Sequence, residues 1–235
     1  MTDREINELL KKAAQAPHEV DPALLQGIAK GIESSLRPVR PLPSTWVLTT
    51  GLILICATVA VAGAARAGFY GFEKMNLLER GLIFPLLAIL ACVAGVKFVN
   101  EMIPGSRSWV SPGVLLLISS VLLVSLFALL FPDYRTNHFF SAGLVCLAVG
   151  LAHAIPSALL SWLVLRRGFA VSRVSAGLAA GTLGGLAGVG MLELHCPNFQ
   201  ATHILVWHTA VLLTAGGVGA FVGWLLHFPV GVSRR

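Results

Sequence analysis

The stretch AGLAAGTLGGLAGVGMLELHCP, residues 176–197, places glycines at four-residue steps inside an apolar run and ends in a short polar motif. The same spacing recurs in three rows: Gly177/Gly181/Gly185, Gly184/Gly188 and Gly219/Gly223. Small residues at i and i+4 let helix backbones approach closely in lipid. Because the run is apolar and no strand precedes it, the glycines indicate helix packing rather than a phosphate-binding loop.

The composition around this stretch is that of a membrane protein. Of the 235 residues, 56% are hydrophobic and 12% are charged, with a mean hydropathy of +0.80, whereas soluble domains have about 25% charged residues. We therefore predict an all-α polytopic membrane protein with six transmembrane helices over 44–235 and a short helical cytoplasmic segment over 1–43. The six apolar windows are of spanning length and cover about 46–65, 82–100, 112–132, 139–165, 174–194 and 203–228.

The distribution of Lys and Arg predicts the orientation. With a cytoplasmic N-terminus, 13 of the 17 basic residues fall on inside segments, and the external loops keep only Arg66, Lys74, Arg80 and Arg135. This positive-inside pattern predicts that both termini lie in the cytoplasm. It also accounts for the net charge of +6 without a nucleic-acid partner. The longest external loop, about 66–81, is too short for a folded sensor or enzyme domain.

Two amphipathic helices are predicted within residues 1–36. Thr2 and Glu5 form a capping box for the first, and Asp21 caps the second, with Pro22 at the first helical position. Each helix has one apolar stripe, and a tail of this length cannot bury both stripes in a core of its own. The residues predicted to contact a partner are Ile6, Leu9, Leu10, Ala13, Leu24, Leu25, Ile28 and Ile32.

Two kinds of partner could cover these stripes: the lipid bilayer surface or a groove on another protein. The first helix mixes acidic and basic side chains on its polar face and has no aromatic anchor, which favours the protein groove. Residues 37–43 are rich in proline, and an extended polyproline-like segment rises about 3 Å per residue. This segment is either a spacer that holds the helices away from the bilayer, with Arg37 and Arg40 near anionic lipid, or a simple linker.

The densest set of reactive side chains surrounds one short external loop, in ELHCPNFQATHILVWH, residues 193–208. Thiolate, imidazole and carboxylate groups are the ligands that borderline and soft metals prefer, although the spacing matches no specific zinc motif. A transition metal could bind there, and no other cofactor is expected. The candidate ligands are Glu193, His195, Cys196 and His203.

The four cysteines fall into two groups. Cys56 and Cys92 lie mid-span and are expected to be small buried hydrophobes, whereas Cys196 is expected to be exposed to an oxidising compartment, with a pKa lowered by neighbouring imidazoles. Cys146 lies about two turns below the outer end of its span, roughly 10 Å at 1.5 Å per residue. A disulfide needs Cα atoms within about 7 Å, and so pairing of Cys146 with Cys196 stays open.

The segment LRPVRPLP (36–43), six spans with both ends inside, and ELHCP (193–197) together resemble the NrsF family. These are six-helix membrane anti-sigma factors that hold extracytoplasmic-function (ECF) sigma factors in bacteria. The resemblance implies that the N-terminal segment binds and silences a sigma factor, and that the membrane domain releases it under envelope, metal or oxidative stress. It also implies a location in the bacterial inner membrane and a regulator rather than an enzyme, with Cys146 and Cys196 as the sensing residues.

The two alternative functions are a permease and a thiol oxidoreductase. A small-solute or ion permease with a regulatory tail would need charged groups within the membrane or broken helices in matching halves, and the spans offer almost none. A membrane-embedded thiol oxidoreductase would be expected to have a CxxC pair, which this sequence does not contain. The sensor with a helical output arm remains the preferred interpretation.

Overall fold

A computed structural model describes residues 5, 7–8, 11–12, 22–35, 43–103, 105–106, 110–165, 170 and 172–226. The chain divides into two compact units, Met1–Pro41 and Leu42–Arg235. Every regular element among the described residues is helical, which confirms the predicted all-α fold.

The first unit contains α2, Pro22–Ser35, which begins at the proline that the sequence places at the first helical position. Leu25, Ile28 and Ile32 are 53%, 50% and 54% exposed on this helix. Residues 5, 7–8 and 11–12 are also helical. Ile6, Leu9, Leu10, Ala13, the Leu24 side chain and most of the proline-rich segment 37–43 lie outside the described residues.

The second unit contains the six predicted spans, each long and apolar enough to cross a membrane. They are α3 (Thr45–Ala67), α5 (Leu77–Glu101), α6 (Pro112–Leu130), α7 (Phe139–Leu165), α8 (Arg173–His195) and a last span that runs from α9 (Ala201–His203) through the π-helix η1 (Ile204–His208) into α10 (Thr209–Leu225). The protein is therefore a multi-pass membrane protein.

The connection between the first two spans is more ordered than the predicted loop 66–81. It contains the short helix α4, Tyr70–Lys74, and α5 begins five residues earlier than expected. The Asn76 side chain accepts a hydrogen bond from the Glu79 backbone N–H, and the Glu79 carboxylate accepts one from the Asn76 N–H. This capping box sets the start of the helix, which lies before the apolar window that predicts the span.

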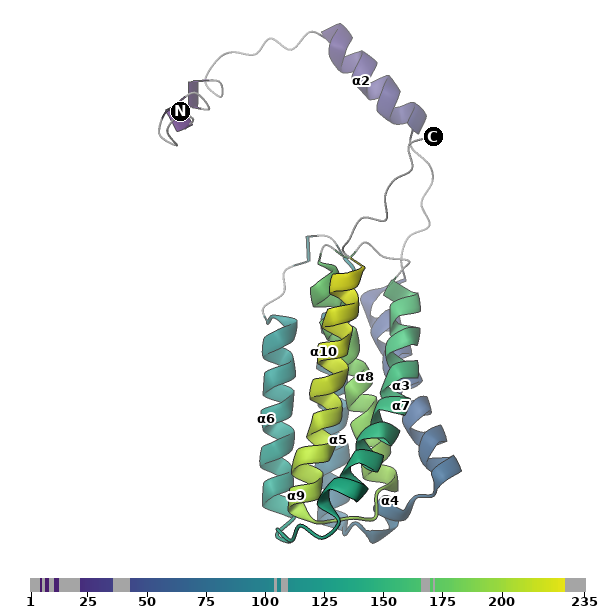
Figure 1. Cartoon of the computed structure of the whole chain (residues 1–235). Helices are drawn as coiled ribbons and strands as arrows, with labels where there is room; N and C mark the ends of the chain where they lie inside the picture. Colours follow the sequence, from purple (N-terminus) through teal and green to yellow (C-terminus); the bar gives the residue numbers. More distant parts are fainter. Residues whose placement is uncertain are drawn as a thin grey trace. The chain divides into compact units, whose positions relative to one another are not determined.

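Helix α8 is the centre of the bundle (Figure 1). It packs against α3, α5, α6, α7 and α10, and 72% of its most apolar window is buried, against 22–44% for the other spans. The glycine-rich stretch is therefore surrounded by other helices, while the other five spans present more of their surface to lipid.

The glycine rows of α8 face two different helices. One row meets the backbone of α10, where a Cβ at Gly181 would collide with the Ala215 carbonyl. The other row meets α7, where a Cβ at Gly184 would lie 2.7 Å from the Ala154 oxygen and one at Gly188 would lie 2.5 Å from the Gly150 oxygen. Only a residue without a side chain fits at these crossings, so the close approach that the spacing predicts is present.

Replacing Gly181 with Ala should force α8 and α10 apart, and overpacking of this kind costs about 1–3 kcal/mol. We expect a lower midpoint of thermal unfolding in detergent. The control is Gly190→Ala, on the same helix, where an added Cβ meets nothing within 4 Å and the midpoint should be unchanged. Equal midpoints for the two variants would show that the glycine contact does not limit stability.

Candidate functional site

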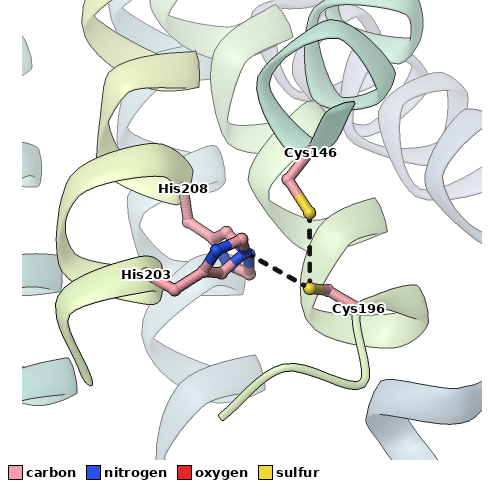
Figure 2. Close-up of side chains that lie close together, drawn as sticks. All are labelled: Cys146, Cys196, His203 and His208. Atoms are coloured by element: carbon pink, nitrogen blue, oxygen red, sulfur yellow. Dashed lines mark hydrogen bonds between the residues drawn. The ribbon is translucent and has the colours of Figure 1, made fainter. Parts of the chain in front are cut away.

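Four potential metal-ligand side chains converge at one end of the bundle. This end carries α4 and α9 (Figure 1). The four side chains are those of Cys146 from α7, Cys196 at the end of α8, and His203 and His208 from the last span, and each offers a ligand atom within 4.8 Å of the others. Figure 2 shows the four side chains pointing toward one another. We call this group the Cys/His cluster.

The two thiols of the cluster are in contact. The Sγ atoms of Cys146 and Cys196 are 3.4 Å apart, and both residues are free cysteines. The predicted difference in depth between the two residues, which left their contact open, is wrong because the spans do not end at the same level. Cys196 caps α8, its N–H bonding the Leu192 oxygen at 2.7 Å, and this helix end lies beside the second turn of α7.

Cys196 is sealed by the segment that joins the first two spans. A Cβ at Gly71 of α4 would lie 2.8 Å from the Cys196 carbonyl oxygen, so the two backbones are in close contact. His195 Nδ1 lies 3.0 Å from the Gly68 oxygen, and Lys74 Nζ donates to the Pro197 oxygen at 3.3 Å. Cys196 is consequently only 3% exposed, and the predicted exposure of this thiol is wrong.

The pKa of the Cys196 thiol also differs from the prediction. Its hydrogen bond with Cys146 and its burial raise the pKa of the thiol, and they outweigh the opposing effect of His203 and His208. The imidazoles do lower the pKa of Cys196, as predicted, but the net shift is upward, so the predicted low pKa of this thiol is wrong. Elsewhere, Cys56 is buried as expected, but Cys92 is exposed on the surface of α5.

A π-helix positions the two histidines. In an α-helix of 3.6 residues per turn, residues five apart point about 140° away from each other. The wider turn of η1, with hydrogen bonds from i to i+5, brings His203 and His208 to the same side, and their ring centroids are 5.6 Å apart. Both side chains are buried.

The start of the last span is held by the connection between α6 and α7. Phe131 stacks on Phe199 with ring centroids 5.5 Å apart. The Ala201 N–H donates to the Asp133 carbonyl at 2.6 Å, and the Thr202 hydroxyl donates to the Arg135 carbonyl at 2.7 Å. These contacts fix α9 and, through it, the position of His203.

Glu193 is not a member of the cluster but contacts one of its residues, His208. Its Oε1 atom lies 2.6 Å from His208 Nδ1, and both side chains are 1% exposed. With Nδ1 occupied, Nε2 is the atom that His208 can offer to the cluster. That atom makes no hydrogen bond with any described residue.

The structure changes the predicted set of metal ligands. Of the four candidates, Cys196 and His203 are in the cluster, while Glu193 supports His208 and His195 faces Gly68. Cys146 and His208 complete the group instead. The sequence contains His208 at five residues from His203, but that spacing brings the two together only with a π turn between them.

Six spans and a buried group of thiols and imidazoles define a multi-pass membrane protein whose reactive side chains are concentrated at one end. The chain matches the NrsF family, negative regulator of sigma F, over residues 33–227. It belongs to this family, and its function is negative regulation of a sigma factor. No curated protein and no solved structure matched the chain. The family match includes the cluster and begins after Ile32, so all eight predicted partner-binding residues precede it.

The raised pKa of Cys196 should be visible in its alkylation by iodoacetamide. In the folded, detergent-solubilised protein, the rate at Cys196 should be slow and should keep rising with pH beyond the range where an ordinary thiol, of pKa about 8.5, levels off. Cys146→Ala removes the hydrogen bond that contributes most to the shift, and so the profile should move to lower pH. Peptide mass spectrometry measures the rates, with Cys56→Ser as the control; a profile like that of a free thiol would contradict the geometry.

Proposed function

We propose that this protein is a membrane-embedded anti-sigma factor of the bacterial inner membrane. Its N-terminal helices hold an ECF sigma factor in the cytoplasm, and its membrane domain releases that factor in response to envelope, metal or oxidative stress. The observation that carries the proposal is the family match over residues 33–227. In this role the protein acts by binding and release, not by catalysis.

The distribution of basic residues supports the orientation that this function requires. By sequence, 13 of the 17 basic residues fall on the segments predicted to be cytoplasmic. The other four, Arg66, Lys74, Arg80 and Arg135, fall on the segments predicted to be external, which include α4 and the connection between α6 and α7. The positive-inside rule then favours an extracytoplasmic location for the end that carries α4 and α9 and for the Cys/His cluster, and a cytoplasmic location for the N-terminal segment.

The exposed stripe on α2 supports a role in binding the sigma factor. Leu25 and Ile28 are each at least half exposed and share one helix face with Ile32, as the spacing i, i+3, i+7 requires. An amphipathic helix of this kind fits the helix-in-groove mode of protein recognition. The remaining predicted contacts, Ile6, Leu9, Leu10, Ala13 and Leu24, extend the same proposal to the first helix and the start of α2.

The packing of the bundle supports communication between its two ends. The cluster draws on α7, α8 and the last span, which are also the helices joined by the glycine contacts. Close-packed helices shift together, because an interface without empty space cannot accommodate the displacement of one helix alone. A chemical change at Cys146 or Cys196 therefore has a route along α8 to the opposite end of the bundle, where α3, the span that follows α2 in the sequence, begins (Figure 1).

Binding through α2 is tested with Ile28→Asp in the full-length tagged protein. The variant places a charge in an apolar groove, which should cost about 2 kcal/mol or more and reduce recovery of the sigma factor identified with the wild-type protein by mass spectrometry. Gln26→Asp adds the same charge to another face of the same helix and should bind normally. Equal recovery with both variants would remove α2 from the interface.

Sensing through the thiols is tested with a sigma-dependent reporter. Cys146→Ser and Cys196→Ser should each change induction by cadmium, chromate or an oxidant, because they alter the two sulfur atoms that touch. Cys56→Ser and Cys92→Ser should leave induction intact. A Cys146→Ser, Cys196→Ser double variant with the wild-type dose curve at wild-type abundance would exclude thiol sensing.

A further inference from the structure

We propose that Cys146, Cys196, His203 and His208 form a tetrahedral binding site for Zn²⁺, built from two thiolates and two imidazoles. The four ligand atoms lie within 4.8 Å of one another. They come from three different spans, so an ion bound there would join α7, α8 and the last span at one point. The site stands on this geometry and does not depend on the sigma-factor function.

Two of the distances within the cluster match those of a tetrahedral zinc site. Bond lengths of about 2.3 Å to sulfur and 2.0–2.1 Å to nitrogen place ligand atoms roughly 3.3–3.8 Å apart. The two sulfur atoms are 3.4 Å apart, and Cys196 Sγ lies 3.6 Å from His203 Nε2. Small side-chain rotations would therefore be enough to close the group around one ion.

The state of His208 is an independent indication of a ligand. Its Nδ1 is held by Glu193 at 2.6 Å, and its buried Nε2 makes no hydrogen bond with any described residue. Buried polar atoms normally have a partner. A histidine that binds a metal through one nitrogen usually gives its other N–H to a carboxylate or carbonyl, which fixes the tautomer. Glu193 is thus a positioning residue for a His208 that coordinates through Nε2.

The π-helix gives a second independent indication. A π turn is rare, and such turns occur frequently at functional sites. Here the turn spans Ile204–His208 and has one evident structural result, which is that His203 and His208 lie on the same side. A pair of hydrogen-bonded thiols would need neither histidine in this position.

The donor set selects the class of ion. Thiolate and imidazole ligands favour Zn²⁺ and related softer ions over Mg²⁺ and Ca²⁺, which prefer oxygen. Two thiolates also balance the charge of a divalent ion in a buried site. Cys146 is the half-buried member of the group, and so its side is where an ion can approach.

The test uses the full-length protein in detergent, with thiols reduced by a phosphine under anaerobic conditions and then counted. Zn²⁺ is titrated in competition with a chromophoric chelator, and Co²⁺ is added as a spectroscopic probe. We expect one Zn²⁺ per chain, and Co²⁺ spectra with a thiolate charge-transfer band and the intense visible bands of tetrahedral coordination.

Four variants distinguish this site from general thiol or histidine binding. Glu193→Gln should weaken Zn²⁺ binding by about 10–100-fold, as is typical for loss of an outer partner, while Cys196→Ser and His208→Gln should weaken it further. His195→Gln is the matched control: it removes an imidazole next to Cys196 whose Nδ1 faces Gly68, and affinity should be unchanged.

Three results would overturn the proposal. The first is a helical, monodisperse protein with all four thiols free that takes up no Zn²⁺. The second is wild-type affinity in His208→Gln, and the third is a Co²⁺ spectrum without the thiolate band. Recovery of the sigma factor is measured on the same preparations, so loss of the metal site and loss of sigma binding are scored separately.

Discussion

The close contact between α8 and its neighbours is the constraint on which the rest of this protein depends. With glycine at the crossings, the α8 backbone reaches the carbonyl groups of α10 on one side and of α7 on the other. In lipid, where burying apolar side chains gives no hydrophobic gain, such close van der Waals contact is a main source of helix association. The same contacts determine which helix ends meet, and therefore which side chains can form a cluster.

The cluster end is closed by short connections rather than by a separate domain. Gly68, Gly71 and Lys74 cover the end of α8, and Asp133 and Arg135 hold the start of α9. These are mainly contacts to backbone atoms, and so they depend on chain geometry more than on side-chain type. The result is a buried reactive site at an end of the bundle where the connections between the described helices are short.

Much of the fold could be predicted because lipid imposes simple rules on sequence. The six spans follow from apolar length, and the glycine rows follow from i, i+4 spacing. The site was only partly predictable. Cys196 and His203 are predictable as ligands because they share a polar loop. Cys146 is fifty residues away in the sequence, and only the family resemblance names it, as a sensing residue; the assumption that all spans end at one level places it too deep. The burial of Cys196 depends on α4, whose Gly71 makes its contact through the backbone and leaves no recognisable pattern in the sequence.

His208 was not predicted as a ligand for a different reason. The helical period used to read a sequence is 3.6 residues, and at that period His203 and His208 point in different directions. A π turn holds one residue more than an α turn, so η1 amounts to a single extra residue in an otherwise ordinary span. The extra residue leaves the span apolar. Relative to an α-helix of the same sequence, it rotates the residues that follow it about the helix axis. If the same residues formed an ordinary α-helix, His203 and His208 would point about 140° apart, so the two-histidine arrangement lasts only as long as the π turn does.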